Sequence, residues 1–234
     1  MVIRMNERLR SKNNWGSVAL LLIFVFLERG VCAAQEPSPQ ASITVAQILS
    51  RMTANTAGLT SYKVPIHIDA HVKKGPVSVP VPMDGERYFK APDSMAVKVN
   101  SGVPDVAKAF SNTYASLGTP LTWVKTYDIT YDSTGNVDGH SVYTLRATYK
   151  KPSHVDHILL DVDTATADPI QARWFYTNGA TIVMHLQHTV VSGQYRLPSR
   201  ESLDVHFPEY SGTAVVTYGT YATNIPLDPS VFAK

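Results

Sequence analysis

The chain has 234 residues, a length that suits one domain or at most two. Apolar residues make up 44% of it and charged residues 17%, so it can bury a substantial core. A formal net charge of only +2 argues against nucleic acid as a partner, because binding phosphate needs a concentrated basic surface.

The N-terminal segment has the pattern of a secretory signal peptide. Four basic side chains within the first twelve residues precede an apolar run at 17–27, and small residues predict cleavage after Ala33 or Ala34. The run is shorter than the roughly 20 residues of a membrane span. The sequence therefore predicts a signal peptide at 1–34 and a periplasmic protein, with an uncleaved anchor or lipidation of Cys32 as the alternatives.

Cleavage at that point changes the chemistry of the chain. It removes five Lys or Arg residues, two Asp or Glu residues and the single cysteine, which leaves a formal charge of −1. The mature chain then has no thiol nucleophile and no disulfide, so its stability must come from its core. Residues 35–42 read as a Pro/Ser-rich linker, and one domain is expected at 43–234.

The first element of this domain is predicted to be an amphipathic helix at about 44–57. Thr44 and Gln47 fit a capping box. The next apolar residues follow helical spacing, and Gly58 is a suitable stop.

The period then changes to that of strands. Residues 61–75 alternate apolar with polar positions, and 75–85 repeat the pattern with three prolines. Proline removes a donor from the strand ladder, so this second strand is expected at a sheet edge or a bulge. A third strand pair is predicted at 87–100 and a second amphipathic helix at 104–117.

From residue 121 onward the chain is predicted to be almost entirely β, with turn residues between the strands. The predicted strands are 122–132, 140–151, 155–163, 169–178, 180–191, 194–207 and 212–223. With the early strands this makes about ten, in a mainly β (α+β) antiparallel meander with two helices. The lack of a β–α rhythm argues against a Rossmann or TIM arrangement.

An acidic stretch at 158–176 is the first candidate for a chemical site. Asp161, Asp163 and Asp168 could hold a metal or carry acid–base chemistry. A calcium loop starting at the first of them would need an oxygen ligand at its fifth position and Glu at its twelfth, where the chain has Ala165 and Ala172. We therefore interpret the stretch as the polar tip of a hairpin, where Asp163→Asn and Asp168→Asn should each change the stability by at most about 0.5 kcal/mol.

The eight histidines give no stronger signal. Those spaced three apart on a strand point to opposite faces, so they do not chelate easily, and we expect the histidines to face solvent. No nucleophile elbow, phosphate loop or zinc-protease helix is present in the sequence. The prediction is a protein that is not an enzyme and that uses no cofactor or metal.

Several segments taken together resemble the periplasmic carrier and sorting proteins of outer-membrane lipoproteins, the LolA–LolB type. These segments are residues 45–64, 83–99, 158–205 and 221–234, and their order and spacing also match. The resemblance implies a curved, open antiparallel half-barrel of ten to eleven strands, with helices as a lid and an apolar inner surface that holds acyl chains. It also makes Arg87 a candidate lid contact, against the alternative of an arginine on the outer surface.

Period-two alternation gives a set of inward-facing residues for this cavity: Val64, Ile66, Ile68, Val79, Val81, Trp174, Met184 and Leu186. The alternative is that these side chains fill a closed core. We predict a monomer that binds lipid or lipoprotein acyl chains and exchanges them with a membrane-bound donor or acceptor protein. The alternative function is a cell-envelope sensor or structural module that binds a protein partner with the same fold.

Overall fold

The computed structural model describes residues 43–99 and 120–232, which belong to the unit Ser42–Lys234. The predicted signal peptide, linker and helix at 104–117 lie outside these residues.

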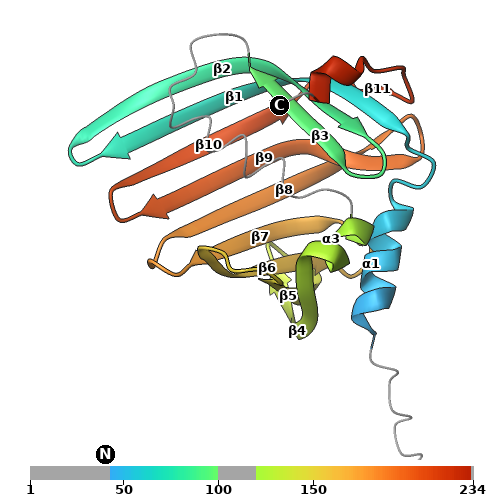
Figure 1. Cartoon of the computed structure of the whole chain (residues 1–234), viewed down its shortest axis with the longest axis horizontal. Coiled ribbons are helices and arrows are strands. Elements are labelled where there is room, and N and C mark those ends of the chain that lie inside the picture. The colour runs from blue at the N-terminus through green and yellow to red at the C-terminus, as the bar shows by residue number, and fades with distance from the viewer. Residues whose placement is uncertain (1–42, 100–119, 233–234) are drawn as a thin grey trace, which may run out of the picture. The chain divides into compact units, whose positions relative to one another are not determined.

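In the part of the chain that the structure describes, eleven strands form one antiparallel sheet (Figure 1). The strands are β1 (Ser61–Lys74), β2 (Val77–Lys90), β3 (Ser94–Val99), β4 (Tyr127–Val137), β5 (His140–Tyr149), β6 (Val155–Asp163), β7 (Pro169–Tyr176), β8 (Thr181–Val191), β9 (Tyr195–Phe207), β10 (Tyr210–Tyr218) and β11 (Ala222–Thr223). Their order is β3-β2-β1-β10-β9-β8-β7-β6-β5-β4, and β11 pairs with β1. In the described residues β3 and β4 do not pair with each other, so the curved sheet stays open. The predicted half-barrel is confirmed.

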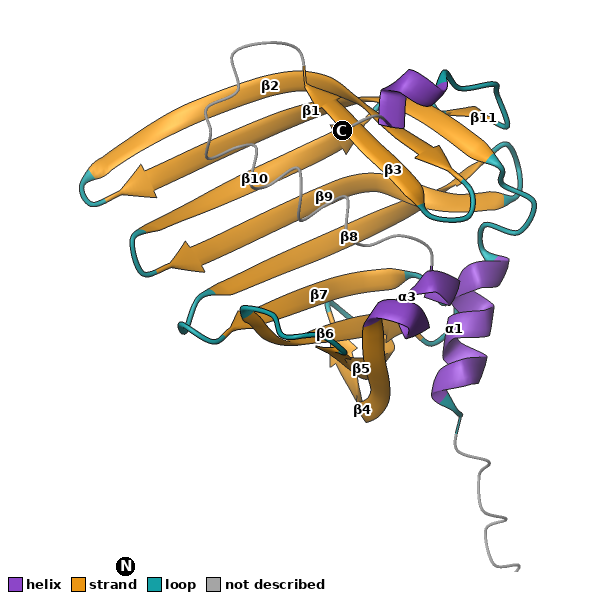
Figure 2. Cartoon of the chain, in the orientation of Figure 1, coloured by secondary structure: helices purple, strands orange, loops and turns teal. Residues whose placement is uncertain are grey.

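Within residues 43–99 and 120–232, two α-helices accompany the sheet, α1 (Val45–Ala54) and α3 (Pro120–Thr126), with a 3-10 turn η1 (Pro229–Phe232) near the end of the chain. The helices contact each other beside one end of the strands (Figure 2). Among the described residues, neither helix has the length and apolar content that crossing a membrane would require.

The predicted capping box of α1 is confirmed. The backbone N–H of Gln47 donates to Thr44 Oγ1 at 3.2 Å, and the Gln47 side chain accepts from the backbone N–H of Thr44 at 2.8 Å. The helix ends at Ala54 with Asn55 as its C-cap, a little before the predicted stop at Gly58. Of the four residues that the helical spacing indicated, Ile48, Leu49 and Met52 are buried and Val45 is half-buried.

Several predicted boundaries differ from the structure: β4 runs on to Val137, the strand predicted at 212–223 divides into β10 and β11, and two further differences have a clear physical reason. Residues 122–126 belong to α3 and not to a strand, since Pro120 suits the first turn of a helix even though the following Thr, Trp and Val residues favour strands. The predicted break at Gly85 is absent, because β2 runs straight through it. This glycine lets β3 approach: an added Cβ would lie 2.5 Å from the carbonyl oxygen of Lys98.

The proline-rich half of β2 lies at an edge, as predicted. Strand β1 pairs with all of 77–90, whereas β3 pairs only with 85–90. Within the described residues, Pro80 and Pro82 therefore pair with β1 alone. No second strand on their other side needs the backbone N–H that proline lacks.

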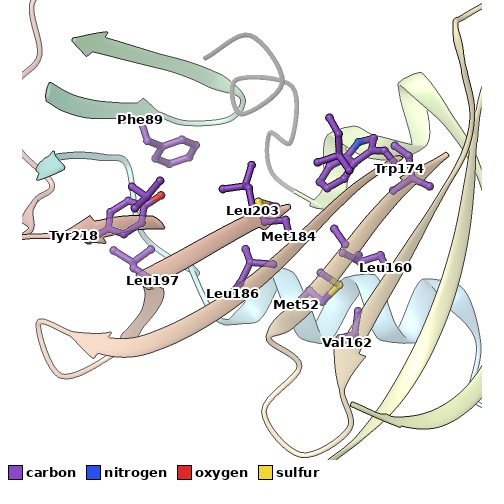
Figure 3. Packing of buried hydrophobic residues seen from close by; sticks show 14 of the residues in the cluster. Met52, Phe89, Leu160, Val162, Trp174, Met184, Leu186, Leu197, Leu203 and Tyr218 are labelled. Carbon is purple, nitrogen blue, oxygen red and sulfur yellow. The ribbon is translucent and has the colours of Figure 1, made fainter. Parts of the chain in front are cut away.

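The core lies on the inner face of the sheet, against α1 (Figure 3). Met52 of α1 joins Leu160, Met184 and Leu186 of the sheet in one buried cluster. Side chains alternate between the two faces of β1, and those on its inner face join this core, where Val64 is fully buried.

Candidate ligand-binding cavity

A cavity of about 150 Å³ opens between the helices and the inner face of the sheet. Most of its surface is apolar. Side chains from α1, α3 and seven strands contribute to that apolar lining, among them Met52, Phe89, Trp123, Leu160, Met184, Leu186 and Leu197. Figure 3 shows several of them converging from α1 and the strands. A cavity with such a lining favours an apolar group.

A second cavity of about 30 Å³ continues the first toward β4 and β5. The two share Trp123, Leu160 and Ala172 in their linings. Since Ala172 is fully buried and small, it helps to leave this interior space unfilled.

A buried ion pair lines the larger cavity. Arg87 of β2 donates from Nη1 to Glu201 Oε1 of β9 at 3.2 Å, and it also donates to the hydroxyl of Tyr218. The side chains of Arg87 and Glu201 are only 7% and 2% exposed. Burial raises the pKa of Tyr218 well above its ordinary value, so this phenol stays neutral. The cluster of Arg87, Glu201 and Tyr218 therefore carries one positive charge and one negative charge.

A second ion pair fastens α1 to the sheet. Arg196 Nε of β9 lies 2.9 Å from both carboxylate oxygens of Asp168, and Asn55 Nδ2 donates to Asp168 Oδ1 at 3.0 Å. Asn55 also donates to the carbonyl of Thr166 at 2.9 Å. The turn between β6 and β7 is thereby bonded to the end of α1 and to β9.

The acidic stretch is thus a hairpin turn, as predicted, but its carboxylates are buried. Asp161, Asp163 and Asp168 are 1%, 5% and 4% exposed. Asp161 accepts from Thr144 Oγ1 at 2.6 Å and from Arg173 Nη2 at 3.0 Å. The sequence could not show these partners, because they come from neighbouring strands.

Asp163 closes the turn itself. Its Oδ1 accepts from the backbone N–H groups of Ala165 at 2.8 Å and Thr166 at 2.7 Å, and its Oδ2 lies 2.7 Å from His140 Nδ1. In the described part of the chain, no group of three or more His, Cys, Asp or Glu side chains is placed to hold a metal. The buried carboxylates stabilise the turn through these bonds.

The prediction that the histidines face solvent was wrong for His188. This residue of β8 lines the larger cavity, and burial lowers the pKa of its imidazole. Its Nδ1 is buried without a hydrogen-bond partner among the described residues.

The fold of this chain is similar to that of several solved structures. No protein-family model matches the chain, and no curated protein sequence matches it. A LolA superfamily protein from Nitrosomonas europaea superposes with a TM-score of 0.62 at 14% identity, covering 82% of this chain and 99% of that one. The chain has a LolA-like fold.

Two further structures support the LolA-like fold. A protein domain from Vibrio parahaemolyticus, named for outer membrane lipoprotein sorting, matches with a TM-score of 0.59 at 11% identity. A DUF1329 family protein from Desulfovibrio piger matches with a TM-score of 0.58 at 15% identity. Each match covers 80% of this chain and 94% of the other. The resemblance read from the sequence is confirmed at the level of the fold.

Within this LolA-like fold, two of the eight predicted cavity residues line the larger cavity: Met184 and Leu186. Three others, Val64, Ile66 and Trp174, are buried in the core outside that lining.

The remaining three lie toward the far part of the β1–β2 hairpin. Ile68 and Val81 are half-buried, and Val79 is 49% exposed near the tip. Here alternation gives the face of the strand, but the hairpin extends beyond the helices that cover the cavity.

Arg87 also lines the cavity, so the alternative of an outward-facing surface arginine was wrong. The helix predicted at 104–117 lies outside the described residues, so the lid contact of Arg87 stays a prediction. Sequence reasoning missed Glu201, although a signal for it existed: it occupies an inward position in phase with Leu203 and Val205. A carboxylate in an apolar phase is a candidate for a buried partner.

Proposed function

We propose that this protein is a periplasmic carrier that binds the acyl chains of a lipid or lipoprotein in its LolA-like cavity, without covalent chemistry. The observation that carries the proposal is the partly unfilled apolar space between the helices and the sheet. A well-packed core leaves few voids larger than a water molecule, so a cavity of about 150 Å³ is a sizeable departure from ordinary packing.

The size of the cavity sets how much ligand it admits. An apolar cavity of about 150 Å³ accepts a benzene-sized group, so this one accepts only part of an acyl chain in the conformation described. Longer chains require the lining elements to move apart. Burial contributes about 0.8 kcal/mol per methylene, so affinity should rise about fourfold per added carbon until the space is full.

Export is the second part of the proposal. The proposed signal peptide implies that the mature chain begins at Ala34 or Gln35. N-terminal sequencing of protein from the envelope fraction should find one of these residues. An intact Met1, or a lipid on Cys32, would contradict it.

Filling the cavity tests the binding proposal. Ala172→Leu places a larger apolar side chain where both cavities meet. We expect the variant to fold and to lose at least about tenfold in affinity for a fluorescent fatty acid. The matched control is Ala222→Leu, the same change at an exposed position on β11, which should bind as the wild type does. Unchanged binding by a folded Ala172→Leu variant would contradict the cavity as the site.

A further inference from the structure

We infer that Glu201 is the polar anchor of the cavity and selects amphiphiles whose head group is an uncharged hydrogen-bond donor, such as a hydroxyl or an amide N–H. This inference rests on the proposed function, because it describes the head group of a ligand whose chain occupies the same cavity.

The first observation is a half-satisfied buried carboxylate. Glu201 is 2% exposed and lines the cavity. Its Oε1 accepts from Arg87, but its Oε2 is buried without a hydrogen-bond partner among the described residues. Leaving a buried carboxylate oxygen without a donor is costly, and a ligand that supplies a donor recovers that cost.

The second observation is the neighbouring imidazole. Glu201 pairs across the strands with Leu186, and His188 lies two residues further along β8, just past a bulge where β9 has one extra residue. The imidazole also lines the cavity, and its Nδ1 has no hydrogen-bond partner in the described part of the chain. A hydroxyl can donate to Glu201 and its oxygen can accept from an imidazole N–H, so one small polar group has the chemistry to serve both side chains.

The balance of charge selects against ionised head groups. Arg87 faces Glu201 and Arg196 faces Asp168, so the two ion pairs at the cavity cancel. A carboxylate or phosphate would bring a second negative charge to Glu201, and an ammonium would add a positive charge near two guanidinium groups. An uncharged donor leaves both pairs in place and avoids burying an unpaired charge.

Three ligands of equal chain length separate the contributions of donor, charge and chain. The ligands are dodecanol, its methyl ether 1-methoxydodecane, which cannot donate, and ionised dodecanoate. Affinity is measured at pH 7.5 by displacement of the uncharged probe N-phenyl-1-naphthylamine. We expect the wild type to bind dodecanol at least about tenfold more tightly than the ether, as one hydrogen bond to a charged acceptor implies.

The variant Glu201→Gln removes the charge and keeps the shape. Its preference for dodecanol over the ether should shrink several-fold, and its affinity for dodecanoate should rise, because Arg87 loses its anionic partner. The matched control is Glu209→Gln, the same change at an exposed turn residue, which should keep the wild-type ratios.

The outcomes distinguish failure of the Glu201 anchor from failure of the carrier function. Equal binding of dodecanol and the ether by the wild type would overturn the anchor and leave the carrier function standing. Unchanged ratios in a folded Glu201→Gln variant would also overturn the anchor. Failure of the wild type to bind any of the three ligands would overturn both. If the variant does not fold, the wild-type comparison of alcohol and ether decides alone.

Discussion

At the scale of single residues, the buried carboxylate of Asp168 joins three elements. It accepts from Arg196 of β9 and from Asn55 at the end of α1, while it belongs to the turn before β7. Removing one partner of a buried ion pair leaves the other uncompensated, which is more costly than the loss of an exposed pair.

Asp168→Asn should therefore lower the free energy of unfolding by more than about 2 kcal/mol, which replaces the value of about 0.5 kcal/mol expected from the sequence for an exposed hairpin tip. The matched control is Asp128→Asn, where the side chain is 74% exposed and 3.7 Å from Lys150, and this change should stay within about 0.5 kcal/mol. Urea unfolding at pH 7 measures both. Equal losses in the two variants would contradict the structural role of the buried pair.

The carboxyl group of Asp163 should make the free energy of unfolding depend on pH in the acid range. Burial alone would raise the pKa of its carboxyl, but the N–H groups of Thr166 and Ala165 and the ring of His140 favour the charged form and hold the pKa below the ordinary value of 3.8. The unfolded chain therefore takes up a proton first as the pH falls. The contribution of Asp163 is complete above the ordinary value and is lost as the pH drops through the folded value.

Asp163→Asn removes this titration. Between pH 5 and pH 3 the urea midpoint of the variant should fall less steeply than that of the wild type. A variant with the same slope as the wild type would show that the turn does not stabilise the charged form.

At the scale of elements, Gly85 shows why a break was predicted where the strand continues. Glycine is common both in turns and at close approaches of two backbones, and only the neighbouring strand tells which applies. Here β3 lies so close that a Cβ would meet the carbonyl oxygen of Lys98 at 2.5 Å.

Gly85→Ala should therefore displace β3 and destabilise the protein by about 1–3 kcal/mol. Gly135 of β4 offers the same substitution without the clash, since the nearest atom to an added Cβ is a methyl of Val142 at 3.8 Å. Gly135→Ala should be neutral or slightly stabilising, because it restricts the unfolded chain. Thermal unfolding of the two variants should give shifts of different size, and a neutral Gly85→Ala would contradict the close approach.

Much of the secondary structure could be predicted from the sequence, because period-two alternation and turn residues repeat from residue 140 onward. The capping box of α1 could also be predicted, because Thr44 and Gln47 have the required spacing. The helix α3 could not be predicted in this way, since its seven residues include strand-favouring side chains and are too few to show a helical period.

In the whole molecule, one strand pairing joins parts of the chain that are far apart in sequence and so makes a single sheet. Strand β1 pairs with β10, which links the N-terminal strands to the C-terminal meander. Alternation indicated which face of β1 points inward, but not which strand lies beside it. Alternation predicted Met184 and Leu186 as cavity residues, and it also places Glu201 on the inner face of β9, but the role of Glu201 depends on Arg87 from another strand.

We propose that acyl chains bind between the helices and the inner face of the sheet. Photo-cross-linking with a dodecyl chain that carries a terminal diazirine, followed by peptide mapping, locates the bound chain. We expect labels on cavity residues such as Trp123, Leu160 and Met184, and unlabelled dodecanol should suppress them. Labels confined to the exposed tip around Val79, or labels that dodecanol does not suppress, would contradict it.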